Sequence, residues 1–257
     1  METFLYGVMC FLIFMFGGCL GSFFNVILLR VPEKKDFVKA RSQCPECEHT
    51  LTWYELVPVF SYVFQRGRCR KCMTRISARY LLMELFCGGG CLWVFMTLGF
   101  DRPIDSVQTI IGLLLFPILV ALSAEDIKKT EIPYWCTGSI AVLGVIATVL
   151  SLFLPSNVLW YEHLIGALII SVPFAVFCYL GAMGGGDVQL VAAAGLLLGW
   201  AIVPSVLIAM VTGGIFGIFV KLTRKRATIC FGPFLALGIA AGYLYGHRII
   251  QEYSSMW

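Results

Sequence analysis

Two aspartates border apolar stretches of the chain and could together carry out acid–base chemistry. Asp187 ends the run Gly-Gly-Gly-Asp at 184–187, and Asp126 lies in Ala-Glu-Asp-Ile at 124–127. Carboxylates held within a few ångströms of each other do not both ionise easily, so one keeps its proton while the other stays charged. Such a pair can activate water against a peptide carbonyl, which is the chemistry of aspartic proteases.

Two other interpretations of these aspartates remain open. Both could serve only as N-caps of helices at a wet boundary, where free N–H groups favour a negative charge. Glu125 competes with Asp126 for the first position. The sequence does not assign the proton to one aspartate, because the titration belongs to the pair.

Three glycines precede the second aspartate. Gly184, Gly185 and Gly186 carry no side chains, so an extended peptide could approach their backbone closely. They are candidate substrate-binding residues.

Four cysteines form a second constellation with the spacing of a metal site. Cys44 and Cys47 make one C-x-x-C pair, and Cys69 and Cys72 make another within the largest polar segment. Four thiolates from two such pairs predict a closed, tetrahedral, structural Zn²⁺ site. Disulfides are the alternative, and His49 could replace one thiolate. Metal binding would then supply much of the folding energy of this small, aliphatic-poor segment.

The composition places these groups in a membrane protein. Of 257 residues, 59% are hydrophobic and 13% are charged, and the mean hydropathy is +0.87. These values predict an all-α polytopic membrane protein. Windows of about 18 to 25 apolar residues predict about eight transmembrane helices, at 4–29, 80–99, 107–124, 132–153, 163–182, 187–200, 202–221 and 230–250. The first is expected to be a permanent helix and not a signal peptide.

The basic residues predict the orientation in the membrane. Segments 30–79, 125–131 and 221–228 hold 17 of the 19 Lys and Arg residues, and basic loops are retained on the cytoplasmic side. Eight spans then leave both termini outside. The net charge of +4 is explained by basic loops beside anionic membrane lipid, without nucleic acid.

This topology predicts three parts of the chain. They are a first transmembrane helix at 1–29, a cytoplasmic zinc-ribbon-like loop domain at 30–79, and a seven-helix membrane domain at 80–257. The topology also places both aspartates at the cytoplasmic boundary.

A set of short motifs, taken in order along nearly the whole chain, resembles one family. The motifs are Gly-Ser-Phe-Phe-Asn-Val at 21–26, Arg-Val-Pro at 30–32, the two cysteine pairs with Leu51, Trp53, Leu56, Pro58 and Ser61 between them, Ile76-Ser77, Arg79-Tyr80, Glu84, Asp126, Gly-Gly-Gly-Asp at 184–187, Ala192-Ala193, and Phe-Gly-Pro-Phe-Leu-Ala-Leu-Gly at 231–238. Together they resemble the bacterial type IV prepilin peptidases, which are GxGD-type membrane aspartic proteases.

The resemblance implies a bifunctional enzyme. Such an enzyme cuts the short basic leader from prepilins or pseudopilins after a glycine and methylates the new N-terminal amine, with S-adenosylmethionine as donor. Asp126 and Asp187 take the catalytic positions, and the four cysteines take the metal positions. The resemblance does not identify the pilin system, and the oligomeric state stays unknown.

This chain departs from the family pattern at two places. Ile132-Pro133-Tyr134 replaces the usual Leu-Pro-Asp, and Gln189 replaces the usual Lys after the second aspartate. Neither change removes a carboxylate, so peptidase activity stays the expectation.

The sequence says less about methyl transfer. It has no Rossmann-type G-x-G-x-x-G after a strand. Gly21 and Asn25 are second-tier cofactor candidates, although close helix packing explains small residues in this stretch equally well.

A transporter that uses Asp126 and Asp187 as a proton or ion pair is the rival function. It predicts aspartates near the middle of the membrane and an inverted repeat, and it leaves the cysteine pairs unexplained.

Overall fold

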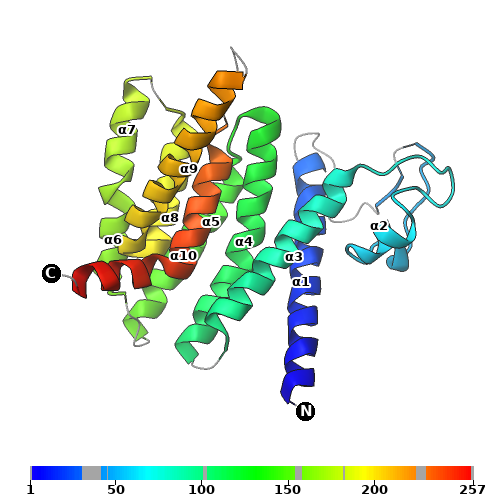
Figure 1. Ribbon diagram of the computed structural model, residues 1–257, viewed down its shortest axis with the longest axis horizontal. Helices are drawn as coiled ribbons and strands as arrows, with labels where there is room; N and C mark the ends of the chain where they lie inside the picture. Colours follow the sequence, from blue (N-terminus) through cyan, green and yellow to red (C-terminus); the bar gives the residue numbers. More distant parts are fainter. Residues whose placement is uncertain are drawn as a thin grey trace. The chain divides into compact units, whose positions relative to one another are not determined.

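The computed structural model of the chain is built from helices (Figure 1). It describes residues 2–30, 42–44, 46–100, 103–153, 158–181, 183–223 and 230–255. Within these residues the only β-type pairings are two isolated bridges, so the predicted all-α class is confirmed. Arg102 and the basic residues 224–226, which entered the orientation argument, lie outside the described residues. The chain divides into two compact units, Met1–Met96 and Thr97–Trp257.

The first unit pairs two long helices with a polar segment between them. Helix α1 runs from Glu2 to Arg30 and α3 from Ala78 to Leu98. The segment between them contains the 3-10 helix η1 (Trp53–Glu55) and the short helix α2 (Phe60–Phe64). A Cβ at Gly21 would lie 2.8 Å from the Met83 carbonyl oxygen. Glycine at this position therefore lets α1 approach the backbone of α3, which is how small residues act in membrane helix pairs.

The second unit contains the remaining helices. They are α4 (Pro103–Lys129), α5 (Tyr134–Phe153), α6 (Trp160–Ile169), α7 (Ser171–Tyr179), α8 (Gly185–Leu198), the 3-10 helix η2 (Gly199–Ala201), α9 (Ile202–Thr223) and α10 (Gly232–Ser255).

Helix α8 forms the centre of this unit. It packs against α5, α6, α7 and α10, and Leu190, Val191 and Ala194 are buried within it. Its 14 residues span only about 21 Å at about 1.5 Å per residue, which is short for a membrane crossing. Gly199, with φ +59°, turns the chain through η2 into α9, so one apolar segment yields two helices.

Helices α9 and α10 lie side by side and meet through a ladder of small residues (Figure 1). Gly238, Gly242 and Gly246 on α10 face Ser205 and Ala209 on α9 and Ala201 at the end of η2. Both sets recur every four residues, so they lie on one face of each helix. Larger side chains on either face would separate the two backbones.

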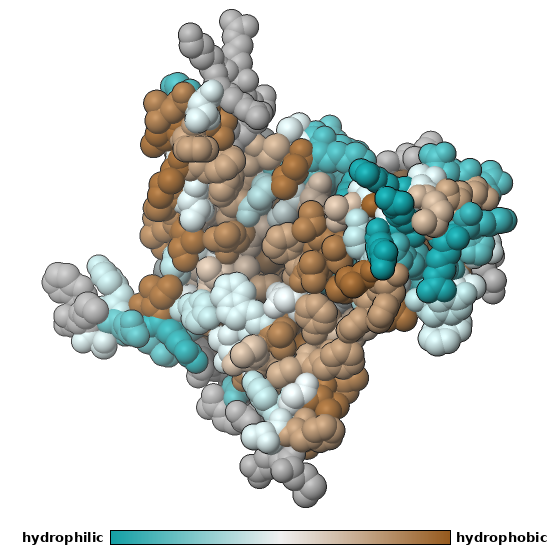
Figure 2. All heavy atoms as spheres, turned by 45° about the vertical axis from the view of Figure 1, so that its right-hand side comes forward, coloured by the Kyte–Doolittle hydropathy of each residue, from teal (hydrophilic) through white to brown (hydrophobic). Residues whose placement is uncertain are grey.

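The apolar surface of the helices is that of a membrane protein. Figure 2 shows hydrophobic side chains over much of the visible helical surface. Large apolar side chains such as Phe153 and Leu222 are exposed. By length and composition, six described segments can cross a membrane, and one of them, Gly185–Thr223, contains both α8 and α9. Each of the eight predicted segments is helical, with 163–182 divided between α6 and α7. The predicted count of about eight helices is therefore approximate.

The crossing of α6 and α8 gives a test of the packing. A Cβ at Gly166 would collide with the carbonyl oxygens of Gly195 and Gly199, which are backbone atoms of the opposing segment. We expect Gly166→Ala to lower the free energy of unfolding by about 1–3 kcal/mol, as overpacking does. The measurement is thermal unfolding of the purified protein in detergent.

Gly138→Ala is the matched control, because a Cβ at this exposed α5 position meets nothing within 4 Å. Alanine should there be neutral or stabilise the helix by about 0.5–1 kcal/mol. Equal melting temperatures for the two variants would contradict the close crossing.

Candidate active site and metal centre

Asp126 lies in the last turn of α4 and is tied to the start of α10. Its side chain is buried, with 5% of the residue exposed. The N–H of Gly232, the first residue of α10, donates to Asp126 Oδ2 at 2.9 Å. The first N–H groups of a helix have no partner within the helix and carry the positive end of its dipole. The bond therefore satisfies a helix terminus and holds one carboxylate oxygen of Asp126.

Asp187 lies in the first turn of α8 and reaches the same end of the unit. Its N–H donates to the carbonyl of Gly184 at 3.2 Å, and its side chain is half-buried. The charge of Asp126 acts on Asp187. The fold therefore brings the two aspartates, 61 positions apart in the sequence, within electrostatic range of each other.

The glycines around this pair differ in the room they leave. A Cβ at Gly186 would lie 3.1 Å from Ile132, and one at Gly232 would lie 2.6 Å from Asp126 Oδ2. Gly185 is exposed, and the nearest atom to its Cβ would be Cys178 Sγ at 4.0 Å. Packing within the unit thus requires a small residue at Gly232 and leaves open space at Gly185.

The competing carboxylate, Glu125, has a different partner. It is buried and forms an ion pair with Lys129, one turn further along α4. Asp126 is the carboxylate that contacts α10 and interacts with Asp187. At the two departures from the family pattern, Tyr134 and Gln189 are exposed.

The four predicted metal ligands come together in the first unit. The sulfur atoms of Cys44, Cys47, Cys69 and Cys72 all lie within 4.8 Å of one another. Two of the Sγ–Sγ distances are 3.7 Å, for Cys44 and Cys72, and 3.9 Å, for Cys47 and Cys69. A tetrahedron with metal–sulfur bonds of about 2.3 Å has sulfur–sulfur edges of about 3.8 Å. The separations fit a bound metal and are too long for disulfide bonds.

The two cysteine pairs are built as equivalent turns. The N–H of Glu48 donates to the Cys44 carbonyl, and the N–H of Met73 donates to the Cys69 carbonyl, each at 3.0 Å. Glu48 and Met73 both have positive φ, 55° and 60°, which is uncommon for residues other than glycine. Antiparallel bridges, Gln43 with Thr50 and Arg68 with Arg75, close the two turns.

His49 does not join the metal cluster. Its Nε2 lies 3.4 Å from Glu55 Oε2, and the same Glu55 oxygen accepts hydrogen bonds from the Thr52 N–H and hydroxyl. The four-cysteine set is thus complete without the histidine.

A large pocket lies within the first unit. Its volume is about 480 Å³, and α1, the segment after the first cysteine pair, and α3 all contribute to its lining. Pockets of roughly 300–1,000 Å³ hold small-molecule ligands and cofactors. Sequence reasoning did not identify this pocket, although several residues of the family motifs line it, among them Ser22, Ser61, Tyr80 and Glu84. The motifs were the only sequence signal for this region, and short motifs do not show that their residues surround a cavity.

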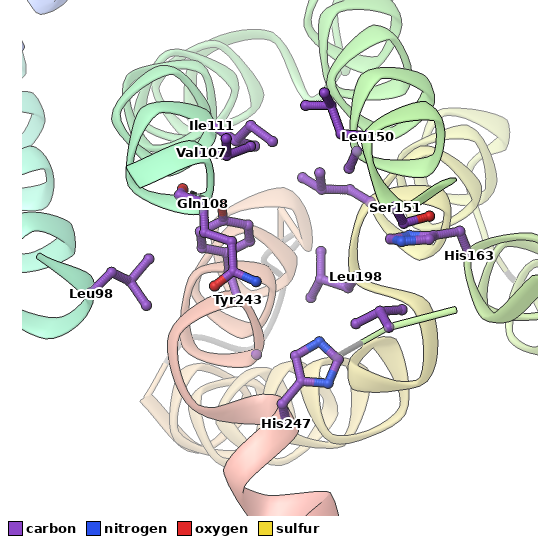
Figure 3. A pocket seen from close by; sticks show the side chains of 14 residues that line it. Leu98, Val107, Gln108, Ile111, Leu150, Ser151, His163, Leu198, Tyr243 and His247 are labelled. Atoms are coloured by element: carbon purple, nitrogen blue, oxygen red, sulfur yellow. Dashed lines mark hydrogen bonds between the residues drawn. The ribbon is translucent and has the colours of Figure 1, made fainter. Parts of the chain in front are cut away.

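A smaller cavity of about 80 Å³ lies in the second unit (Figure 3). His163, near the start of α6, and His247, in α10, both line it, with Gln108 and Tyr243. His163 is held by its Nδ1, 3.0 Å from the Leu196 carbonyl. The end of α6 that carries His163 packs near the C-terminal end of α8, whereas Asp187 stands at the N-terminal end of α8. This cavity is therefore separate from the aspartate pair.

Comparisons with known proteins cover both units. The family described as "Bacterial Peptidase A24 N-terminal domain" matches residues 15–98, and the "Type IV leader peptidase family" matches residues 113–218. No solved structure is significantly similar to the chain.

Three similar relatives carry the name "Prepilin leader peptidase/N-methyltransferase". The protein of Myxococcus xanthus is 35% identical over 84% of this chain and 64% of its own length. Those of Aeromonas salmonicida and Bacillus subtilis are each 32% identical over 95% of this chain, and the matches cover 93% and 98% of their lengths. The family matches, and identity at this level over nearly full length, establish that the chain belongs to the type IV leader peptidase family.

Proposed function

We propose that the protein is a membrane aspartic endopeptidase and N-methyltransferase that acts on prepilins or pseudopilins. The observation that carries the peptidase half is the interaction of Asp126 with Asp187 at one end of the helices of the second unit. The names of the relatives supply the substrate class and the second activity.

The aspartate pair can divide the work of peptide hydrolysis. The ionised carboxylate takes a proton from a water molecule as the water oxygen attacks the scissile carbonyl carbon. The protonated carboxylate hydrogen-bonds the carbonyl oxygen, on which negative charge develops. When the tetrahedral intermediate collapses, the C–N bond breaks and the leaving amine receives a proton. Gly232 N–H holds Asp126 in place throughout.

The position of the pair suits a prepilin. Both aspartates lie at helix ends, Asp126 in the last turn of α4 and Asp187 in the first turn of α8. A prepilin has a basic leader in the cytosol followed by an apolar helix, so its scissile bond lies at the membrane boundary. Cleavage needs an extended segment, because a helix engages its carbonyl groups in hydrogen bonds. The open space at Gly185 supports Gly184, Gly185 and Gly186 as the place where that segment binds.

The protein is a multi-pass membrane protein, and we place it in the bacterial cytoplasmic membrane. The distribution of Lys and Arg supports a cytoplasmic aspartate pair and cysteine segment, with both termini outside. Anionic lipid of the inner leaflet would then face the basic loops. The transporter is not proposed, because neither aspartate lies in the middle of its helix.

The four cysteines support a structural Zn²⁺ ion. Four thiolates fill all four positions of a tetrahedral ion, so no position stays open for substrate or water. When bound, the ion would supply folding energy to the segment that it joins. The four cysteines come from both ends of the segment that contains η1 and α2, so a bound ion would close the loop in which these elements lie.

The first prediction from the proposed function concerns the aspartate pair. We expect Asp126→Asn and Asp187→Asn each to lower the rate of prepilin cleavage by about 10²–10⁴-fold or more, because each removes one proton-transfer group. The measurement is cleavage of a prepilin peptide by purified protein in detergent, where no ion gradient exists.

Asp105→Asn is the control, since it removes a carboxylate from the first turn of the same helix. It should keep full cleavage. Retained cleavage in Asp187→Asn would contradict the pair.

A second prediction concerns the bond that positions Asp126. In Gly232→Ala the new Cβ would lie 2.6 Å from Asp126 Oδ2, so the carboxylate or the start of α10 must move. We expect kcat for cleavage to fall at least about tenfold, with a smaller change in KM. Gly214→Ala in α9 is the control, because a Cβ there meets nothing within 4 Å. Unchanged kcat in Gly232→Ala would show that the position of this oxygen is unimportant.

The third prediction concerns the metal. We expect purified protein to contain about one Zn²⁺ per chain and Cys44→Ser to lose most of it, because a closed site tolerates no missing thiolate. The measurement is metal content by mass spectrometry, together with protease sensitivity of the segment between α1 and α3. Cys19→Ser is the control, since Cys19 lies in α1 outside the cluster. Zinc content that is equal in both variants would exclude this site.

A further inference from the structure

The pocket of the first unit is built around a carboxylate that three chain segments share. Glu84 on α3 is buried, with 7% of the residue exposed, and lines the pocket. Its Oε2 accepts a hydrogen bond from the Val59 N–H at 2.7 Å. The Ser22 side chain of α1 also hydrogen-bonds this carboxylate. Glu84 thereby joins α1, α3 and the segment between them at the wall of the pocket.

The backbone that Glu84 holds is strained. Val59 has φ 65° and ψ −53°, and the N–H of Phe60 donates to the Pro58 carbonyl at 2.7 Å. These are the marks of a γ-turn, which is rare and costly for a β-branched residue. Strain of this kind persists where the surroundings hold it, and it occurs most often at functional sites.

The charges around the pocket have both signs. Glu55 also lines it, with only 2% of its side chain exposed. The Thr52 N–H and hydroxyl, together with His49, hold the pKa of Glu55 below its usual value despite burial, so its carboxylate is ionised at neutral pH. Arg75 lines the pocket as well. Arg30, at the end of α1, lines it too. Two buried carboxylates and two guanidinium groups suit a ligand that carries charges of both signs.

The remaining lining suits an aromatic heterocycle with a sugar. Leu56 and Ile76 give the pocket apolar surface, and Tyr62 and Tyr80 give it aromatic rings. Hydroxyls of Ser61 and Ser77 offer hydrogen bonds. This mixture of an apolar wall and a few polar groups is typical of cofactor sites.

A second observation is a buried side-chain amide beside the pocket that lacks a hydrogen-bond partner. Asn25 is fully buried, and neither its amide nitrogen nor its amide oxygen has a hydrogen-bond partner among the described residues. It lies on α1 one turn from Ser22 and from Leu29, which both line the pocket. Buried amides without partners are rare and call for an explanation. A ligand or its bound water in the adjoining pocket would give this amide a partner.

We propose that this pocket is the S-adenosylmethionine site of the enzyme, with Glu84 and Glu55 recognising the positive charge of the sulfonium and ammonium groups. The proposal rests on the proposed N-methyltransferase function. Arg75 then faces the carboxylate of the methionine part, and the apolar and aromatic wall faces the adenosine. In the reaction, the substrate's N-terminal amine bonds to the methyl carbon, the C–S bond breaks with its electrons left on sulfur, and the amine releases a proton to solvent.

The test measures binding instead of turnover. The full-length protein in detergent is titrated with S-adenosylmethionine and with S-adenosylhomocysteine, whose sulfur is uncharged. Glu84→Gln keeps an oxygen for the Val59 N–H and removes the charge. We expect it to weaken S-adenosylmethionine binding about tenfold, the loss typical of one charge-assisted contact, and to weaken S-adenosylhomocysteine binding less. Glu252→Gln, an exposed change at the end of α10, should bind like the wild type.

Ser61→Phe is a second variant that fills the pocket without altering charge. We expect it to weaken both ligands similarly. Zinc content is measured in both pocket variants as a check on folding, because Cys44 and Cys69 also line the pocket.

Two results would overturn the proposal in distinguishable ways. If the wild type binds the donor and both pocket variants bind it equally well, the donor site lies elsewhere and the methyltransferase function stands. If the wild type cleaves prepilin but neither binds the donor nor methylates the product, the methyltransferase half of the proposed function fails, and the site fails with it.

Discussion

The two candidate catalytic aspartates stand at helix ends, because in an apolar environment the backbone must pair its own hydrogen-bonding groups within helices. Within a membrane every N–H and C=O group needs a partner inside its own helix or a neighbouring one. Free donors therefore remain only in the first turn of each helix. Gly232 offers such a donor, and Asp126 accepts from it. Asp187 stands in the first turn of α8, where an unpaired N–H terminus favours its charge. The same constraint that makes the chain helical thus decides where two carboxylates can be held together.

Close helix packing supplies the precision that the pair requires. Lipid is as apolar as a leucine side chain, so helices in a membrane associate through tight contact and not through burial from water. The small-residue ladder between α9 and α10 and the glycine crossing of α6 and α8 are contacts of this kind. Both involve helices that bear on the aspartate pair, since α10 begins at Gly232 and α8 carries Asp187. A change in these crossings would move the carboxylates relative to each other.

Much of this arrangement could be predicted from the sequence, where the signal lies in neighbouring residues. Apolar length identified the eight helical segments, and the C-x-x-C spacing identified the cysteine cluster, because both signals are local. The proximity of Asp126 and Asp187 needed a topology, which the basic residues suggested. The Asp126–Gly232 bond, the γ-turn at Val59 and the pocket around Glu84 were not predictable. Each depends on how distant segments meet, and nothing near Val59 in the sequence indicates a positive φ for a β-branched residue.

The division of the chain into two units matches the division of its proposed chemistry. The aspartic-protease mechanism needs two interacting carboxylates and a water molecule, and the second unit contains Asp126 and Asp187. Methyl transfer needs a bound donor, and the pocket and cysteine cluster lie in the first unit. The amine that accepts the methyl group does not exist until the peptide bond has been cut, so the two steps have a fixed order. In the proposed scheme, methylation therefore depends on both sites. If the two sites act as proposed, a chain that lost either aspartate would have no amine to methylate, even with its donor pocket intact.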